Sequence, residues 1–255
     1  CLDEISYDTP YLQVFSDKKV FVNLDDSIQY TKTMKMNQIT FSNSTPDGFI
    51  YIDKIEANPF VKINYQNVEI QSNLIGLYNA TNIMAAITVG RYFNVDNEEI
   101  KQALESYQPD NNRSQIIYQN SNEIILDAYN ANPESMSAAL RSLVLFAQER
   151  GGQSWAFLGK MHELGESSPA HHAGIGTLAQ ELGIDHLVAI AAPEYGDSLG
   201  GTLVHHYASI DECLSMTDHF SAGDVVLVKA SRSEGFEVLA QKLESLWLDK
   251  SGVES

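Results

Sequence analysis

The chain has 255 residues, with 34 acidic and 16 basic side chains, which gives a formal net charge of −18 at pH 7. This length is sufficient for one large or two ordinary domains, and a hydrophobic content of 44% is typical of a globular protein. The surplus of carboxylates repels phosphate backbones and anionic membrane surfaces. We therefore expect neither a nucleic-acid nor a membrane partner.

The two cysteines, Cys1 and Cys213, form neither a disulfide framework nor a metal cluster, which is typical of a reducing compartment. No apolar run reaches the ~20 residues of a membrane span, and no signal peptide is visible. A chain that starts at Cys1 without a Met could be a mature lipoprotein. We favour instead a piece of a longer cytoplasmic protein.

The first third of the chain is rich in short β-prone runs separated by Asn, Asp, Ser and Gly. They predict strands over residues 19–23, 49–55 and 60–63. Apolar residues at a helical period then predict a helix over residues 79–93. An Asn cap and two acids in the first turn predict a second helix over residues 97–107.

Pro109 and the polar residues 110–112 indicate a linker, so we place a domain boundary between residues 108 and 109. Strands and helices alternate after it, which predicts an α/β fold with a mainly parallel sheet covered by helices on both faces. In such folds ligands bind beyond the carboxyl ends of the strands. We expect strands over residues 124–127, 155–158, 186–190, 203–206 and 225–229, and helices over residues 133–149, 170–182, 210–217 and 236–248.

Residues 127–133 (DAYNANP) follow a predicted strand and open a predicted helix. Asn132 stands at the N-cap position, before a proline at the first helical position, so capping explains it as well as function does. Capping does not explain Asp127, Tyr129 and Asn130 at the same strand end. Their carboxylate and amide groups could bind ribose hydroxyls or an adenine edge.

Asn79 and Asn82 stand three residues apart at a predicted helix start, and hence on one helix face. Taken alone, a cap with a solvated turn is the favoured interpretation of this pair. Arg113 in the linker is either solvated surface or, between two domains that close on an anion, a phosphate contact.

Two further clusters follow predicted strands. Residues 159–165 (GKMHELG) are followed by two more histidines, but without an H-x-x-x-H spacing or a cysteine partner we expect no metal site. Lys229, Ser231 and Arg232 put two cations and a hydroxyl at the end of the last strand, where a peptide carboxylate is a suitable ligand. No G-x-x-x-x-G-K-[ST] phosphate-cradling loop occurs in the chain.

The run DAYNANPESMSAAL at residues 127–140 resembles the Mur ligases, and within them the branch that adds D-Ala-D-Ala to UDP-N-acetylmuramoyl-tripeptide. Supporting motifs occur in the expected order along nearly the whole chain. They are residues 22–26 (VNLDD), 76–82 (GLYNATN), Asn112-Arg113, 159–165 (GKMHELG) and 228–232 (VKASR).

The resemblance implies an ATP-dependent amide-bond ligase of cell-wall synthesis in the bacterial cytoplasm. In this family ATP phosphorylates the tripeptide carboxylate, and the amine of D-Ala-D-Ala attacks the acyl phosphate. Residues 1–108 would be the C-terminal portion of the central ATP-binding domain, and residues 109–255 the Rossmann-like C-terminal domain. The P-loop and the groups that support Mg²⁺ would lie upstream of Cys1. We therefore expect this chain, which we take to be a monomer, to be inactive by itself.

The resemblance also implies roles for individual residues. Asn79 and Asn82 would contact adenine, Arg113 the phosphates, and Asp127 the ribose, with Asn130 and Asn132 on the nucleotide side. Lys229, Ser231 and Arg232 would face the incoming dipeptide or the acyl phosphate. Two residues depart from the family pattern, Tyr78 in place of a common His and Lys160 in place of a usual Asp. Both leave room for altered ligand contacts.

Two alternatives remain open. A related ligase of the folylpolyglutamate or cyanophycin type is disfavoured by the YNANP run, because those relatives carry other residues at that strand end. A non-catalytic nucleotide- or partner-binding domain could have kept the fold without the reaction.

Overall fold

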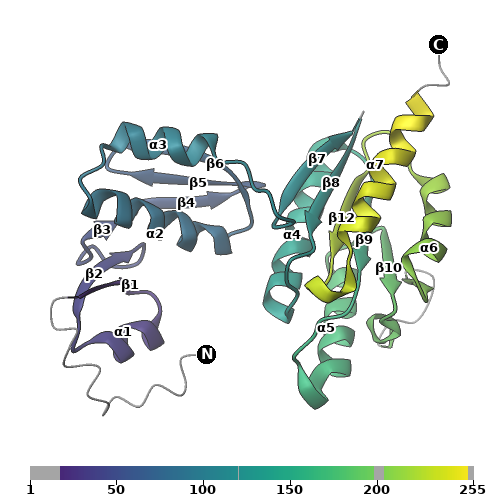
Figure 1. Cartoon of the computed structure of the whole chain (residues 1–255), viewed down its shortest axis with the longest axis horizontal. Coiled ribbons are helices and arrows are strands. Elements are labelled where there is room, and N and C mark those ends of the chain that lie inside the picture. The colour runs from purple at the N-terminus through teal and green to yellow at the C-terminus, as the bar shows by residue number, and fades with distance from the viewer. Residues whose placement is uncertain (1–17, 120, 198–203, 252–255) are drawn as a thin grey trace. The chain divides into compact units, whose positions relative to one another are not determined.

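The structure is a computed structural model that describes residues 18–119, 121–197 and 204–251 (Figure 1). Cys1 therefore lies outside the described residues. The chain divides into two compact units, Cys1–Ser72 with Leu77–Tyr107 and Asn73–Gly76 with Gln108–Ser255. None of the described helices combines the length and the apolar character needed to cross a membrane.

The described residues of the first unit form two three-stranded sheets and three helices, and the end of the last strand, from residue 73 on, is grouped with the second unit (Figure 1). The first sheet is parallel, with the order β1-β2-β3, and in the second, of order β4-β5-β6, β4 and β5 are antiparallel. Helix α2 packs against strands of both sheets. The elements are β1 (Lys19–Asn23), α1 (Ser27–Thr33), β2 (Asn37–Ser42), β3 (Ile50–Tyr51), β4 (Lys54–Ala57), β5 (Phe60–Tyr65), β6 (Val68–Ile75), α2 (Tyr78–Tyr92) and α3 (Asn97–Ser106).

Two expectations for this unit were wrong in detail. The strand expected over residues 49–55 is two strands, β3 and β4, which belong to different sheets. The change of sheet falls between Ile52, whose N–H donates to Ser42 of the first sheet at 3.0 Å, and Asp53, whose N–H donates to Asn64 of the second at 3.1 Å. The N-cap of α3 is Asp96 rather than an asparagine, with two acids in the first turn as expected.

The second unit is built on a six-stranded sheet of order β11-β10-β9-β12-β8-β7, parallel throughout except for β7, which is antiparallel to β8. The mainly parallel sheet of the sequence prediction is therefore confirmed. Its strands are β7 (Gln115–Gln119), β8 (Asn122–Asp127), β9 (Ser154–Leu158), β10 (His186–Ile190), β11 (Val204–Tyr207) and β12 (Val225–Lys229). Its helices are α4 (Pro133–Arg150), α5 (Ser168–Glu181), α6 (Ile210–Cys213) and α7 (Glu237–Ser251).

Helices cover both faces of this sheet. Helices α6 and α7 enclose one core, in which Trp155 and Phe157 of β9 meet Phe236 and Trp247, and α4 and α5 lie on the other face (Figure 1). Strands β8, β9 and β12 are buried at every position, which explains their uninterrupted apolar segments Ile124–Leu126, Trp155–Leu158 and Val225–Val228. Burial also raises the pKa of the Cys213 thiol to about 12, so this cysteine is a packed thiol and not a thiolate.

Three details of this unit differ from expectation. Strand β7 was not expected, and the helix expected over residues 210–217 is α-helical only to Cys213 and continues as a 3₁₀ helix over Leu214–His219. Residue 203, where a strand was expected to begin, lies outside the described residues.

Candidate functional site

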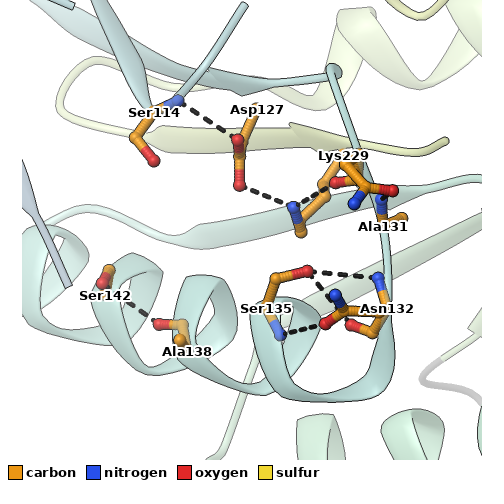
Figure 2. A network of polar contacts seen from close by, with 9 residues as sticks. Ser114, Asp127, Ala131, Asn132, Ser135, Ala138, Ser142 and Lys229 are labelled. Atoms are coloured by element: carbon orange, nitrogen blue, oxygen red, sulfur yellow. Dashed lines mark hydrogen bonds and ion pairs between the residues drawn. The ribbon is translucent and has the colours of Figure 1, made fainter. Parts of the chain in front are cut away.

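Strands β8 and β12 are neighbours, and their last paired residues are Asp127 and Lys229. The Lys229 Nζ donates hydrogen bonds to Asp127 Oδ2 at 2.6 Å and to the Asn130 carbonyl oxygen at 2.8 Å (Figure 2). Lys229 is only 1% exposed, and burying an ammonium group costs several kcal/mol unless it is paired. Asp127 supplies the compensating charge, so two residues expected at the site bind each other.

The other Asp127 oxygen holds the turn that precedes β7. Its Oδ1 accepts a hydrogen bond from the Ser114 N–H at 3.2 Å (Figure 2). In this turn Asn111, Asn112 and Ser114 have φ angles of 58°, 59° and 50°, a left-handed region that Asn adopts more readily than most residues. Arg113 lies within the turn and is exposed. The ion pair at the strand ends is thus connected to the segment that carries Arg113.

Tyr129, two residues beyond the end of β8, lies beside two exposed arginines. The Arg113 Cζ is 3.7 Å from the centroid of the Tyr129 ring, and the Arg232 Cζ is 5.2 Å from it. Both distances are in the cation–π range. Within the part of the chain that the structure describes, neither guanidinium group has a hydrogen bond or an ion pair. Two positive charges without a carboxylate partner therefore meet at one aromatic ring, in a chain of net charge −18.

Ser231 joins the end of β12 to the loop that follows β9. Its N–H donates to the Lys160 carbonyl oxygen at 3.0 Å, and its Oγ accepts a hydrogen bond from the His162 N–H at 3.0 Å. The residue is buried. Ser231 therefore has a structural role, and no described residue accepts its hydroxyl proton, which is available for donation.

Two buried side chains, His172 and Tyr195, also hold the loop that follows β9. His172 Nε2 accepts a hydrogen bond from the Met161 N–H at 2.9 Å, so the ring proton is on Nδ1, which faces the Ser168 carbonyl oxygen at 2.8 Å. The Tyr195 hydroxyl donates to the Gly159 carbonyl oxygen at 2.7 Å. Burial raises the pKa of Tyr195, so this donor stays protonated at neutral pH. The backbone of the loop that carries Lys160 and His162 is therefore held by hydrogen bonds to two buried side chains.

Glu234 is a residue that sequence reasoning did not select. Its Oε1 lies 2.6 Å from His162 Nε2, because the short 3₁₀ turn Arg232–Glu234 brings it back toward the β9 loop. An acid two residues after the VKASR run was the only available signal. Among the described residues no group of three or more His, Cys, Asp or Glu side chains is arranged to hold a metal ion.

The two asparagines of the DAYNANP run differ in their contacts. Asn132 Oδ1 accepts a hydrogen bond from the Ser135 N–H at 2.8 Å, and Ser135 Oγ accepts one from the Asn132 N–H at 3.1 Å (Figure 2). The capping interpretation of Asn132 is thus confirmed. Asn130 is exposed, and its Oδ1 accepts a hydrogen bond from the adjacent Ala131 N–H at 2.9 Å.

In the first unit, Asn79 and Asn82 lie together in the first turn of α2. The Asn82 Nδ2 donates to Asn79 Oδ1 at 3.0 Å, which confirms that they share one helix face. Neither caps the helix, because the N-cap position is Leu77 and it has no side-chain cap. The cap interpretation of this pair was therefore wrong.

The VNLDD run of residues 22–26 forms a strand-end turn in the same unit. Burial acts to raise the pKa of Asp25, but hydrogen bonds from the Ser42 hydroxyl at 2.6 Å and the Asn43 N–H at 2.9 Å outweigh it and lower that pKa below its ordinary value. Asp26 caps α1 through its Oδ1. Both carboxylates are therefore engaged within the unit.

Comparison with known proteins gives the family. The model of the Mur ligase middle domain matches residues 12–90, and that of the Mur ligase glutamate ligase domain matches residues 112–232. The chain belongs to the Mur ligase family. A UDP-N-acetylmuramoyl-tripeptide–D-alanyl-D-alanine ligase of Mycobacterium bovis is 33% identical over 200 residues, which cover 69% of this chain and 39% of the relative.

Solved structures show the same Mur ligase fold. MurF from Acinetobacter baumannii has a TM-score of 0.77 at 24% identity, covering 92% of this chain and 54% of that one. MurF from Thermotoga maritima, solved in complex with ADP, has a TM-score of 0.73 at 20% identity, covering 92% of this chain and 55% of that one. The chain thus spans about two fifths of the length of the curated relative, and about half of each solved Mur ligase chain.

Proposed function

We propose that this chain is part of an ATP-dependent ligase that joins D-Ala-D-Ala to UDP-N-acetylmuramoyl-tripeptide in the peptidoglycan synthesis of a bacterial cytoplasm. Residues 1–108 form the C-terminal portion of its central ATP-binding domain, and residues 109–255 form its C-terminal domain. The observation that carries the proposal is the pair of arginines at Tyr129, which have no carboxylate partner among the described residues and lie beyond the strand end where α/β folds bind ligands. The name of the 33%-identical relative supplies the substrates.

Each unit contains side chains with the chemistry to contact a nucleotide. The ATP supplies a phosphoryl group that activates the carboxylate for amide formation. Arg113 binds its phosphates, because a guanidinium group without a protein partner keeps all its donors for an oxyanion. Asp127 accepts from the ribose hydroxyls, since each of its oxygens makes one contact in the structure and retains a further lone pair. Asn79 and Asn82 contact the adenine, and Asn130 and Asn132 lie on the nucleotide side.

The three residues at the end of β12 have different roles toward the substrates. Arg232, which is exposed, binds the carboxylate of the dipeptide or the acyl phosphate, and the Ser231 hydroxyl proton is available to the same ligand. Lys229 acts indirectly, because its buried ammonium group already serves Asp127 and the Asn130 carbonyl oxygen. For Mg²⁺ the described residues offer no cluster of ligands, so we assign it none of them.

The test uses the chain joined to the matching N-terminal portion of a MurF relative. Phosphate release is measured with ATP, Mg²⁺, UDP-N-acetylmuramoyl-tripeptide and D-Ala-D-Ala. We expect release that requires the dipeptide and is lost in Arg232→Ala, but not in Arg141→Ala, an exposed residue of α4. Release that requires glutamate or another amino acid instead would favour a related ligase, and no release from a folded protein would favour a non-catalytic domain. The 255-residue chain alone, whose sequence has no phosphate-cradling loop, should release none.

A further inference from the structure

Two tyrosine–arginine contacts in the second unit differ in one decisive respect. The Arg150 Cζ is 5.8 Å from the Tyr118 ring, and Arg150 also pairs with the buried carboxylate of Glu123. At Tyr129, by contrast, two guanidinium groups lie beside one ring and neither has a carboxylate among the described residues. The charge of Arg150 is therefore neutralised by a carboxylate of the protein, whereas no described carboxylate neutralises the charges of the two arginines at Tyr129.

The Tyr129 arrangement brings like charges together. Both distances run to the same ring centroid, so the two guanidinium carbons are no farther apart than the sum of 3.7 Å and 5.2 Å. Like charges at that spacing repel one another, by an amount that depends on the local dielectric. The electron-rich face of the ring offsets part of this repulsion, and a ligand with several negative charges offsets the rest.

The ring itself is held in place. Tyr129 follows Asp127 by two residues, and Asp127 is fixed by Lys229 and by the Ser114 N–H. The same Ser114 contact fixes the turn that carries Arg113, and Arg232 follows Lys229 by three residues on the neighbouring strand end. The ring and both arginines are therefore attached to one buried ion pair.

We infer that Tyr129 is a positioning residue that holds Arg113 and Arg232 toward a single polyanionic ligand, the phosphate chain of the nucleotide. This inference rests on the proposed function and changes it at one residue. It assigns Arg232 to the same phosphate anion as Arg113, in place of the dipeptide carboxylate that the family resemblance implies for it. A flexible arginine loses rotamer freedom when it binds. Stacking on Tyr129 removes that freedom before the ligand arrives, so the ring raises affinity without touching the ligand.

The test needs no catalysis and uses the 255-residue chain with sodium tripolyphosphate as the probe. The Nε–Hε groups of the five arginines are followed in ¹H–¹⁵N spectra, at constant ionic strength set with sodium chloride. We expect the Arg113 and Arg232 signals to respond with one shared dissociation constant. Tyr129→Phe, which keeps the ring, should bind within about twofold of the parent chain. Tyr129→Leu should bind about tenfold more weakly, as loss of pre-organisation in two arginines requires.

Tyr118→Leu is the matched control. It removes the other tyrosine–arginine contact, so it should move the Arg150 signal and leave the affinity for tripolyphosphate unchanged. The inference is overturned if the parent chain shows no saturable binding, if the two arginines titrate with different constants, or if Tyr129→Leu binds as well as Tyr129→Phe.

The outcome separates this inference from the proposed ligase activity. Ring-dependent binding of tripolyphosphate by a protein that forms no amide in the joined form would overturn the ligase assignment alone. Amide formation with an unchanged KM for ATP in Tyr129→Leu would overturn the positioning role alone.

Discussion

Lys229 and Asp127 close the carboxyl ends of two adjacent parallel strands with a buried ion pair of 2.6 Å. Each side chain comes last in its strand, and the register of β8 and β12 places them opposite one another. This pair determines which of the expected site residues can face a ligand. Lys229 is enclosed, whereas Arg113, Tyr129 and Arg232 around it are exposed.

We predict that Lys229→Met lowers the free energy of unfolding of the second unit by about 3 kcal/mol, because it leaves the Asp127 carboxylate without its cation. This value is at the lower end of the cost of breaking a buried ion pair. The free energy of unfolding, measured in urea, checks this. The control Lys160→Met changes an exposed lysine and should stay within about 0.5 kcal/mol of the parent chain. Adding Asp127→Asn to Lys229→Met should recover part of the loss. Equal stability of the two lysine variants would contradict the account.

Asn132 offers a test that separates a cap from a ligand contact. Asn132→Ala should lower the free energy of unfolding by about 1 kcal/mol, because the Ser135 N–H loses its acceptor, whereas Asn132→Ser keeps a cap and should be nearly neutral. Asn130→Ala is the control, since among the described residues the Asn130 side chain accepts a hydrogen bond only from the adjacent Ala131 N–H. If the nucleotide role proposed for Asn132 is right, Asn132→Ser will be stable but will raise the KM for ATP in the joined enzyme. A stable variant with unchanged kinetics would leave Asn132 as a cap alone.

His186 makes the stability of the second unit depend on pH. Its ring stacks on Trp155 with centroids 3.6 Å apart. Burial, and then the charge of His205, lower the pKa of His186, while Asp185 and Asp224 act to raise it and His219 to lower it. The folded protein therefore binds this proton less readily than the unfolded chain. The neutral ring contributes stability above its ordinary pKa of about 6.5, and that contribution is lost as the pH falls through the lowered value.

The corresponding experiment compares melting temperatures between pH 8 and pH 5. His186→Gln should fall less steeply with decreasing pH than the parent chain. His171→Gln, an exposed histidine of α5, should follow the parent curve. Identical slopes for His186→Gln and the parent chain would mean that other groups carry the pH dependence.

The central strands of the second unit could be predicted because β8, β9 and β12 are buried at every position, unlike the partly exposed β7, which the sequence did not reveal. Runs such as Val225–Lys229 are apolar at every position but the last, so both the strand and its functional end can be read directly. The first unit was harder. Strand β2 (NQITFS) and strand β6 (VEIQSNLI) contain Asn and Gln, which have low strand propensity, and pairing with neighbouring strands decides their structure.

The sequence predicts which residues lie at the site, but not which of them bind one another. The sequence places Asp127, Arg113, Lys229 and Arg232 near a sheet edge, and nothing in it says which cation is paired with the carboxylate. The strand register decides that, and it selects Lys229. The sequence shows Tyr129 at the strand end but indicates no role for it. The two arginines that lie beside its ring are 16 residues before it and 103 residues after it, so their contact appears only in the structure.

The measurement that most directly tests the central proposal is the mass of the product formed by the chain joined to a matching N-terminal portion. The reaction contains ATP, Mg²⁺, UDP-N-acetylmuramoyl-tripeptide and D-Ala-D-Ala. The account predicts a UDP-linked product heavier than the substrate by one dipeptide less one water, formed with one phosphate per product and lost in Arg113→Ala and Arg232→Ala. A folded, ATP-binding protein that leaves the tripeptide unchanged would contradict it.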